Sequence, residues 1–325
     1  MHTRLLYLFT RTPLHVGAGS SVGAIDQPIQ RERHTGFPII PASSLKGSFA
    51  DQWNDSLGQA DKNGRHWREA GEAAWLFGSD DAKEEKAAAG ALLFGEARLL
   101  AFPIRSAKGS YAWITSPLLL RRAARDGVIA ESDIPAFPPE NDADGKALFS
   151  KSGPLALPND KLVLEEYTFS HTGSDETKLK STAEALQKLL PDDPVWKEVA
   201  SRLAILSDGQ MSFFATTACE VAQHVRISDE TGTADPGGLF NQENVPSEAL
   251  FYALVHATDS RLKGKAYAGT AFTDKKAEDA INTFCSKVTE KKVFQFGGDA
   301  STGLGYCTVC LAEPNKNTVP APAHA

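Results

Sequence analysis

Apolar segments of strand length at both ends of the chain constrain its fold most. Residues 4–10 are largely apolar and stop before Thr12-Pro13, and residues 306–311 form the last apolar run before a proline-containing tail. Short apolar runs bounded by turn residues are typical of buried strands. Helical patterns cover residues 181–206 and 275–288 between them. Strands at both ends with helices between them predict an α+β sheet domain that carries insertions.

A long loop and then a helix follow the first predicted strand. Residues 16–36 contain several glycines and show no periodicity, which predicts an ordered loop of a functional kind. Ser43 or Ser44 is expected to cap the next helix, in which large apolar residues recur every four positions. That helix therefore has one face suited to the core.

The domain organisation is predicted from composition. We expect a single domain over residues 1–311 and a flexible tail over 312–325. The polar, alanine-rich stretch of about 55–90 is predicted to be a helical insertion, and about 126–210 a second insertion. Within the second, the proline-rich and acidic residues 126–160 predict surface loops.

A hairpin is predicted in the last third of the chain. Residues 218–227 and 249–257 are alternating apolar runs, and the segment between them is rich in glycine and proline. This pattern predicts a long hairpin over about 218–257 with an irregular tip.

Overall charge argues against nucleic-acid binding but does not exclude it. The 325 residues carry a formal net charge of −7, whereas phosphate neutralisation normally needs excess Lys and Arg. Backbone N–H groups of glycine-rich loops and helix N-termini can hold phosphates without net charge. No apolar run is long enough for a membrane span, and the four cysteines are sparse, so we expect a cytoplasmic protein without a membrane partner. Cys307 and Cys310 lack a second pair for a zinc site.

Two glycine-rich motifs could carry chemistry. Residues 296–306 include Gly297, Gly298, Gly303 and Gly305, which could form a nest of N–H groups for RNA phosphates or an ordinary turn between strands. The residues alone do not decide between these interpretations.

The second motif places one histidine and one aspartate on the predicted loop. His15 and Asp26 could perform acid–base chemistry or hold a metal ion. Asp26 precedes Gln27-Pro28, so an ordinary turn residue is the stronger interpretation of the motif taken alone.

Three sets of residues, near the start, in the last third and near the end of the chain, resemble the RAMP superfamily of CRISPR proteins. The resemblance is to the backbone subunit of type III-B (Cmr) effector complexes in particular. His15–Gly19, Ile25–Arg31 and His34–Gly47 are similar to its N-terminal signature, in which an Asp-x-Pro-Ile-x-Arg loop precedes Pro-x-Ser-Ser-Leu-Lys-Gly. The glycines of 297–305 match its C-terminal glycine loop, and Val225-Arg226-Ile227 with the following residues is similar to its hairpin, called the thumb.

The resemblance implies a modified ferredoxin-like (RRM-like) fold with a β-hairpin thumb and helical insertions. It also implies that copies of the chain stack with other Cmr subunits into a homo-oligomeric filament along guide RNA. Each thumb would push one base out of the guide–target duplex, and the protein would be an endoribonuclease that cuts the target RNA at regular intervals.

The resemblance implies roles for individual residues as well. Asp26 corresponds to the catalytic aspartate, which would hold a divalent metal ion (Mg or Mn) or accept a proton from the 2′-OH of RNA. His15 is a second catalytic candidate. The predicted RNA contacts are Arg31, Ser43, Ser44, Lys46, Arg226, Gly297, Gly298, Gly303 and Gly305.

Two other functions stay open from the sequence. The same fold could serve as a catalytically silent RNA-binding scaffold, although an aspartate in a family-like loop argues against this. A standalone RAMP nuclease that processes guide precursors would usually have a more basic surface and lack the Asp-x-Pro-Ile loop.

Overall fold

The structure is a computed structural model that describes residues 2–19, 21, 23–53, 71–79, 87–174, 176–262 and 271–315. Most of the predicted insertion at 55–90 and of the predicted tail at 312–325 lies outside these residues. The described part of the first insertion includes a short helix, α2 (Glu72–Phe77).

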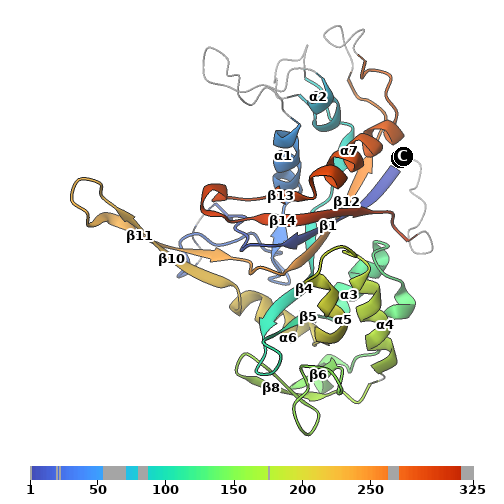
Figure 1. Ribbon diagram of the computed structural model, residues 1–325, viewed down its shortest axis with the longest axis vertical. Helices are drawn as coiled ribbons and strands as arrows, with labels where there is room; N and C mark the ends of the chain where they lie inside the picture. The colour runs from blue at the N-terminus through green and yellow to red at the C-terminus, as the bar shows by residue number, and fades with distance from the viewer. Residues whose placement is uncertain are drawn as a thin grey trace.

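Four antiparallel strands form the centre of the fold in the order β14-β1-β12-β4 (Figure 1). One helix, α1, connects the first strand to β4, and another, α7, connects β12 to β14. Two β-α-β units interleaved in this order make a ferredoxin-like core, so the predicted α+β class is confirmed. The elements of this core are β1 (His2–Thr10), α1 (Ala42–Gln52), β4 (Ala97–Arg105), β12 (Leu250–Ala257), α7 (Ala277–Lys291) and β14 (Tyr306–Ala312).

Strand β1 is buried on both faces of the sheet. Leu6 and Leu8 belong to the core cluster that includes residues of α1 and α7, whereas Leu5, Tyr7 and Phe9 belong to the cluster on the other face. Because successive side chains of a strand point to opposite faces, a strand covered on both sides is a continuous apolar run. This explains why the first strand was visible in the sequence.

The connection from β4 to β12 contains the second insertion, which extends the sheet in the order β4-β5-β9-β6-β8-β7. In Figure 1 it forms the lower half of the molecule. The elements of this connection before the hairpin are β5 (Tyr111–Thr115), α3 (Pro117–Arg125), β6 (Lys146–Phe149), β7 (Lys161–Leu164), β8 (Tyr167–His171), α4 (Glu176–Gln187), α5 (Val199–Arg202), β9 (Leu203–Ile205) and α6 (Asp208–Thr217), so β5 and α3 precede the predicted bounds of about 126–210. The remaining described elements are β2 (Ile39–Ile40), β3 (Leu92–Phe94), β10 (Glu220–Ile227), β11 (Ala234–Asn244), β13 (Val293–Gln295) and 3₁₀ turns at Glu131–Asp133, Glu140–Asp142, Trp196–Glu198 and Ala300–Thr302.

Two local predictions about the insertion were wrong. Residues 126–160 are not only surface loops, because strand β6 lies within them and Ala147, Leu148 and Phe149 are fully buried. The helical pattern over 181–206 is confirmed in α4, the 3₁₀ turn at Trp196–Glu198 and α5, but its last residues form strand β9, which pairs with β5 and β6. Flanking prolines and acids hid the short buried strand in the first case.

The hairpin exists, but its second arm was placed wrongly. Strand β10 pairs with β11 over residues 234–244, and the run 249–257 is instead strand β12 between β1 and β4. Strand β12 is apolar because it is buried in the centre of the sheet, whereas β11 is largely polar. The β10–β11 hairpin projects from the body of the molecule in Figure 1.

Among the described helices, none is both long and apolar enough to cross a membrane.

Candidate functional site

Asp26 lies on the loop between β1 and α1, and this loop is anchored on the base of the hairpin. The loop begins with a short antiparallel pairing in which Gly17 lies opposite Ile29. Beyond it, Gln27 forms a parallel bridge with Gln242 of β11. The Gln27 N–H donates to the Asn241 carbonyl at 3.1 Å, and the Glu243 N–H donates to the Gln27 carbonyl at 2.9 Å. The loop therefore runs along the hairpin as an extra edge.

Asp26 itself makes a reciprocal pair of bonds with Asn241. The Asp26 N–H donates to Oδ1 of Asn241 at 2.7 Å, and the Asn241 N–H donates to Oδ2 of Asp26 at 2.9 Å. Asn241 also donates from Nδ2 to the carbonyl of Ala24 at 3.0 Å. The Asp26 residue is exposed, so its carboxylate is held in place at the surface.

The two residues that follow Asn241 in β11 connect the other predicted motifs. Gln242 is buried and donates from Nε2 to Oδ2 of Asp299 in the glycine loop at 2.6 Å. Glu243 is buried and accepts the Ile29 N–H through Oε2 at 3.0 Å. Consecutive residues at the end of β11 thus fix the Asp26 loop and the glycine loop relative to each other.

The glycine loop is a tight turn as well as a surface feature. Gly297 and Gly305 have φ of 76° and 79°, and a side chain on either would collide with a backbone carbonyl, that of His15 or of Phe296. Gly303 has φ of 92° but open space around it. Glycine is required at the first two positions both for the backbone conformation and for the close approach.

Gly298 differs from its neighbours. Its N–H donates to the His15 carbonyl at 3.0 Å, its φ is not positive, and a side chain there would meet only the His15 ring, at an ordinary contact distance of 3.8 Å. Gly297 and Gly305 therefore make a tight turn, whereas Gly298 and Gly303 leave open surface, and contact of that surface with RNA stays a prediction.

His15 is buried beneath this loop, next to the site rather than on its surface. Its Nδ1 lies 2.7 Å from the backbone carbonyl of Glu243. Because a carbonyl can only accept, Nδ1 carries the hydrogen. The ring fixes the start of the loop against β11, which favours a structural role.

Arg31 is also part of an internal network. Its Nη1 donates to the carbonyls of Gly36 and Ala215 at 2.6 and 2.8 Å, and its Nη2 donates to Oε1 of Glu243 at 2.5 Å. Nη2 also lies 3.3 Å from the Cys219 sulfur, and burial raises the pKa of that thiol to about 12. With both terminal nitrogens engaged, Arg31 supports the loop from within, and its predicted contact with RNA stays a prediction.

The predicted residues of α1 lie at its first turn. The helix begins at Ala42 after Pro41, and no side chain of the described residues caps it, so the expected serine cap was wrong. Ser43 is exposed, whereas Ser44 and Lys46 are partly exposed and Lys46 interacts within the chain. An uncapped first turn leaves backbone N–H groups for a phosphate.

Helix α1 packs beside the glycine loop. The Phe49 ring lies 5.1 Å from that of Phe294 in β13 and 5.3 Å from that of Phe296. Arg226 is distant from this arrangement: it lies on the projecting hairpin, exposed, and pairs with Asp235 at 2.9 Å.

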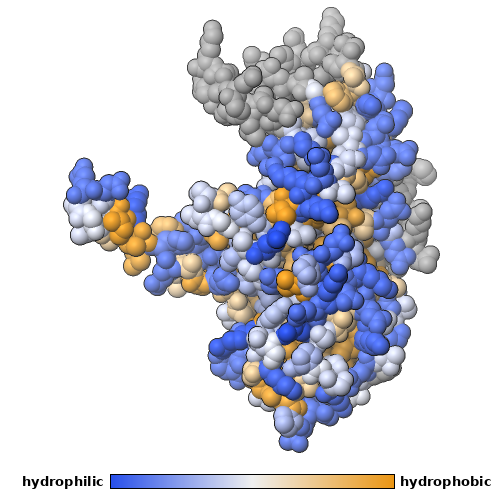
Figure 2. Space-filling view, viewed as in Figure 1, coloured by the Kyte–Doolittle hydropathy of each residue, from blue (hydrophilic) through white to orange (hydrophobic). Residues whose placement is uncertain are grey.

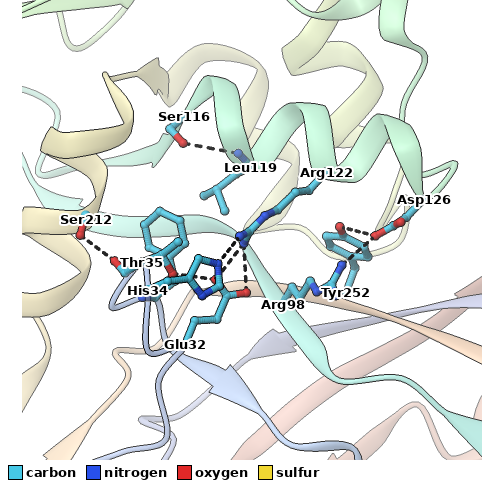
Figure 3. Close-up of polar contacts among 11 residues, drawn as sticks. Glu32, His34, Thr35, Arg98, Ser116, Leu119, Arg122, Asp126, Ser212 and Tyr252 are labelled. Atoms are coloured by element: carbon cyan, nitrogen blue, oxygen red, sulfur yellow. Dashed lines mark hydrogen bonds and ion pairs between the residues drawn. The ribbon is translucent and has the colours of Figure 1, made fainter. Parts of the chain in front are cut away.

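A second polar cluster holds the loop on its other side (Figure 3). Glu32 accepts two bonds from Nη1 of Arg122 in α3, at 2.9 and 3.0 Å, and one from Thr35 at 2.6 Å. Burial would raise the pKa of Glu32, but the bonds from Thr35 and Arg122 outweigh it and lower the pKa. Ser212 of α6 donates to the Thr35 carbonyl at 2.6 Å. The loop is therefore braced by the second insertion as well as by the hairpin.

Protein side chains alone do not build a metal site here. Among the described residues, no group of three or more His, Cys, Asp or Glu side chains is arranged to hold a metal ion. Asp26 offers a single exposed carboxylate. Because Mg²⁺ is commonly held by one or two carboxylates together with substrate phosphates, Asp26 fits such an ion only when RNA supplies the other ligands.

Comparison with known proteins decides the family. The family model for the RAMP superfamily matches residues 8–308. The chain belongs to the RAMP superfamily. It is 32% identical to the CRISPR system Cmr endoribonuclease Cmr4 of Pyrococcus furiosus over 325 residues, which covers 98% of both chains. A shorter stretch of 71 residues is 39% identical to the Csm3 endoribonuclease of Enterococcus italicus, covering 21% of this chain and 33% of that protein.

Solved structures share the same RAMP fold. The crystal structure of oligomeric Cmr4 from P. furiosus matches with a TM-score of 0.64 and 28% identity, over 96% of this chain and 99% of that one. A subunit in the cryo-EM structure of the type III-B Cmr-beta complex bound to cognate target RNA matches with a TM-score of 0.63 over 98% and 99% of the chains. At 20% identity, that second likeness concerns the fold alone.

The polar run of β11, Asn241–Asn244, was missed in the sequence. Its signal was weak because a polar strand at the base of a hairpin has the composition of a loop. Four consecutive amide or carboxylate side chains, three of them buried, are nevertheless unusual for a strand.

Proposed function

We propose that this chain is the repeated backbone subunit of a type III-B (Cmr) CRISPR ribonucleoprotein, binds guide RNA, and cleaves complementary target RNA at regular intervals. The relative of nearly full length is an endoribonuclease of the Cmr system. The observation that carries the proposal is the exposed Asp26 carboxylate, fixed at the base of the projecting hairpin. A scaffold without catalytic function would not need a surface carboxylate fixed in this way.

The chemistry depends on geometry around one phosphate of the target. The 2′-oxygen attacks the adjacent phosphorus while the bond to the 5′-oxygen breaks, and the proton of the 2′-OH must leave. Regular A-form geometry keeps these atoms out of line, so displacing a base frees the sugar to rotate. Asp26 beside that phosphate would accept the proton, a contribution of about 10²–10⁴-fold. A divalent cation bound there would instead polarise the phosphate and lower the pKa of the attacking oxygen.

The hairpin is suited to displacing a base. Its outer part carries exposed apolar side chains, visible as the hydrophobic patch along the projection in Figure 2. Val225, Ile227 and Leu239 are 50%, 50% and 67% exposed. Apolar side chains inserted between bases partly unstack them. The Asp26 loop is docked on the lower end of the same hairpin, so the side chains that displace a nucleobase and the carboxylate would move as one unit.

Guide RNA would follow the surface formed by α1 and the glycine loop. The first turn of α1, with Ser43, Ser44 and Lys46, would offer N–H groups to phosphates, and the nearby surface at Gly298 and Gly303 has no side chain to obstruct RNA, while the N–H groups of these two glycines bond within the chain. Binding through backbone groups is compatible with a net charge of −7. Arg226 bonds to Asp235 through Nε, so it would contact RNA through its terminal nitrogens or by exchanging Asp235 for a phosphate, since exposed ion pairs contribute little.

Assembly and location belong to the same proposal. The fold shared with oligomeric Cmr4 supports contacts between copies, and we propose a filament of this chain along the guide in the cytoplasm. Light scattering of the protein with guide RNA and partner subunits is expected to show multi-copy particles. Particles containing single copies only would contradict the backbone role.

Cleavage is tested with the reconstituted complex, guide RNA and end-labelled complementary RNA. Wild type is expected to give regularly spaced cuts, and Asp26→Ala is expected to lower the cleavage rate by at least about 100-fold with target binding unchanged. EDTA lowers wild-type cleavage similarly if a cation takes part, and has no effect if Asp26 acts alone as a base. An Asp26→Ala complex that cuts at the wild-type rate would remove Asp26 from the mechanism and favour the scaffold function.

A further inference from the structure

We propose that Asn241 is a positioning residue for the Asp26 carboxylate, so that the hairpin, and not the loop itself, determines where the carboxylate lies. The inference rests on the proposed function of Asp26. Its basis is three hydrogen bonds between Asn241 and the residues 24–26, two of which use the Asn241 side chain.

The loop has few bonds of its own near Asp26. Among the described residues of the loop, which do not include 20 and 22, its internal backbone pairing lies around 16–18 and 28–30, where the Ala18 N–H donates to the Pro28 carbonyl and the Gln30 N–H to the Val16 carbonyl. Beyond that pairing, Gly23 takes a φ of 62° with open space around it. A glycine in such a position leaves the chain free to rotate. The position of residues 24–26 must therefore be fixed from outside the loop.

Asn241 provides that restraint from both ends of its amide. Oδ1 accepts from the backbone of Asp26, and Nδ2 donates to the backbone of Ala24. Because the amide is planar, the two bonds together fix the direction of the loop as well as its distance from β11. The main-chain bonds from β11 to Gln27, and from the Asn241 N–H to the Asp26 carboxylate, would persist without the side chain, so its removal frees the backbone of residues 24–26 and leaves the rest of the loop docked.

This arrangement makes Asn241 a specific link between RNA engagement and chemistry. Asn241 lies on β11, which is one arm of the hairpin that projects toward the nucleic acid in the proposed complex. A shift of about 1 Å in a reacting group costs about 100-fold in rate, so loss of the Asn241 side chain would be felt in the chemical step.

The experiment measures single-turnover cleavage at saturating target in the assembled complex. Asn241→Ala is expected to lower the rate constant by about 10- to 100-fold, with half-saturating target concentration, assembly and melting temperature unchanged. Asn241→Asp keeps an acceptor for the Asp26 N–H but sets a carboxylate oxygen against the Ala24 carbonyl and a second negative charge beside Asp26, so its loss is expected to be at least as large. Gln223→Ala is the matched control, because Gln223 is exposed and lies directly opposite Asn241 in β10.

Each contrary outcome has a distinct meaning when Asp26→Ala is measured in parallel. If Asp26→Ala is inactive and Asn241→Ala cuts like Gln223→Ala, the positioning function is refuted and the proposed function stands. If Asn241→Ala loses target binding or assembly as much as cleavage, Asn241 is a structural residue of the hairpin and the inference is also refuted. If Asp26→Ala cuts at the wild-type rate, the proposed function fails, and the inference fails with it.

Discussion

Replacing Arg31 by alanine tests whether this arginine supports the site from within or contacts RNA. The side chain of Arg31 is 18% exposed and that of its partner Glu243 is 5% exposed. Removal of the guanidinium leaves the Glu243 carboxylate with the Ile29 N–H as a partner and takes a donor from the carbonyls of Gly36 and Ala215. Breaking a buried ion pair from one side costs about 3–5 kcal/mol, because the remaining charge stays out of water.

The matched control for this prediction is Arg226→Ala. Arg226 makes a comparable bond to Asp235 at 2.9 Å but is 72% exposed. Exposed ion pairs contribute at most about 1 kcal/mol. Both arginines were predicted to contact RNA, so the comparison distinguishes a loss of stability caused by a buried ion pair from a loss of RNA binding.

Urea unfolding of the isolated protein and guide RNA binding are the two measurements. Arg31→Ala is expected to lower the free energy of unfolding by about 3–5 kcal/mol, and Arg226→Ala by less than about 1 kcal/mol. RNA affinity per folded molecule is expected to fall more for Arg226→Ala. An Arg31→Ala protein that unfolds at the wild-type urea concentration but binds RNA poorly would refute the structural interpretation and restore the predicted RNA contact.

Two further predictions concern the glycine loop and pH. Gly297→Ala is expected to lower the free energy of unfolding by more than about 1 kcal/mol, since the added side chain would collide with a carbonyl and the φ is positive. Gly298→Leu should leave urea unfolding nearly unchanged and weaken guide RNA binding. Equal losses of stability and of RNA binding in both variants would favour a plain turn. Burial, with the charge of Asp193, raises the pKa of Glu248 from 4.5 to about 7. Between these pH values the folded protein therefore binds more protons than the unfolded chain, so its free energy of unfolding falls as pH rises through that window. Glu248→Gln is expected to remove about 1 kcal/mol of this fall. Urea unfolding of the variant with the same pH dependence as wild type would contradict the assignment.

The sequence predicted much of the core because β1 is buried on both faces and β14 is a largely apolar strand with Cys307 and Val309 buried. Residues 4–10 and 306–311 lie in the observed strands β1 and β14, and the helix expected at 275–288 corresponds to α7. The hairpin was mislocated because strand β12 has the apolar pattern of an arm, while the true arm β11 pairs through its backbone and has mostly polar side chains. Backbone pairing leaves little trace in composition, which is why polar strands are difficult to locate.

The same reasoning limited the prediction of the site. Asp26 and the glycine loop were identified through motifs, but a motif gives residue types and not partners. Arg31 illustrates this, because an arginine within a predicted nucleic-acid motif is in the structure bonded to carbonyls and to Glu243, more than two hundred residues away in the sequence. Asn241 was not identified, since its importance arises only from a contact with Asp26 across a similar separation.

The polar end of β11 explains how a chain with large insertions keeps its site together. The segment with His15 and Asp26 lies near the start of the sequence and the glycine loop near its end, and both bond to consecutive residues of the strand, Asn241, Gln242 and Glu243. Side chains in a strand alternate between faces, so consecutive residues can reach loops on both sides. The insertion between β4 and β12 contains this strand at its end, directly before the core strand β12. A change in the length of the insertion before the hairpin therefore leaves the position of the site relative to the core sheet unchanged, because that position is determined by the few residues that join β11 to β12.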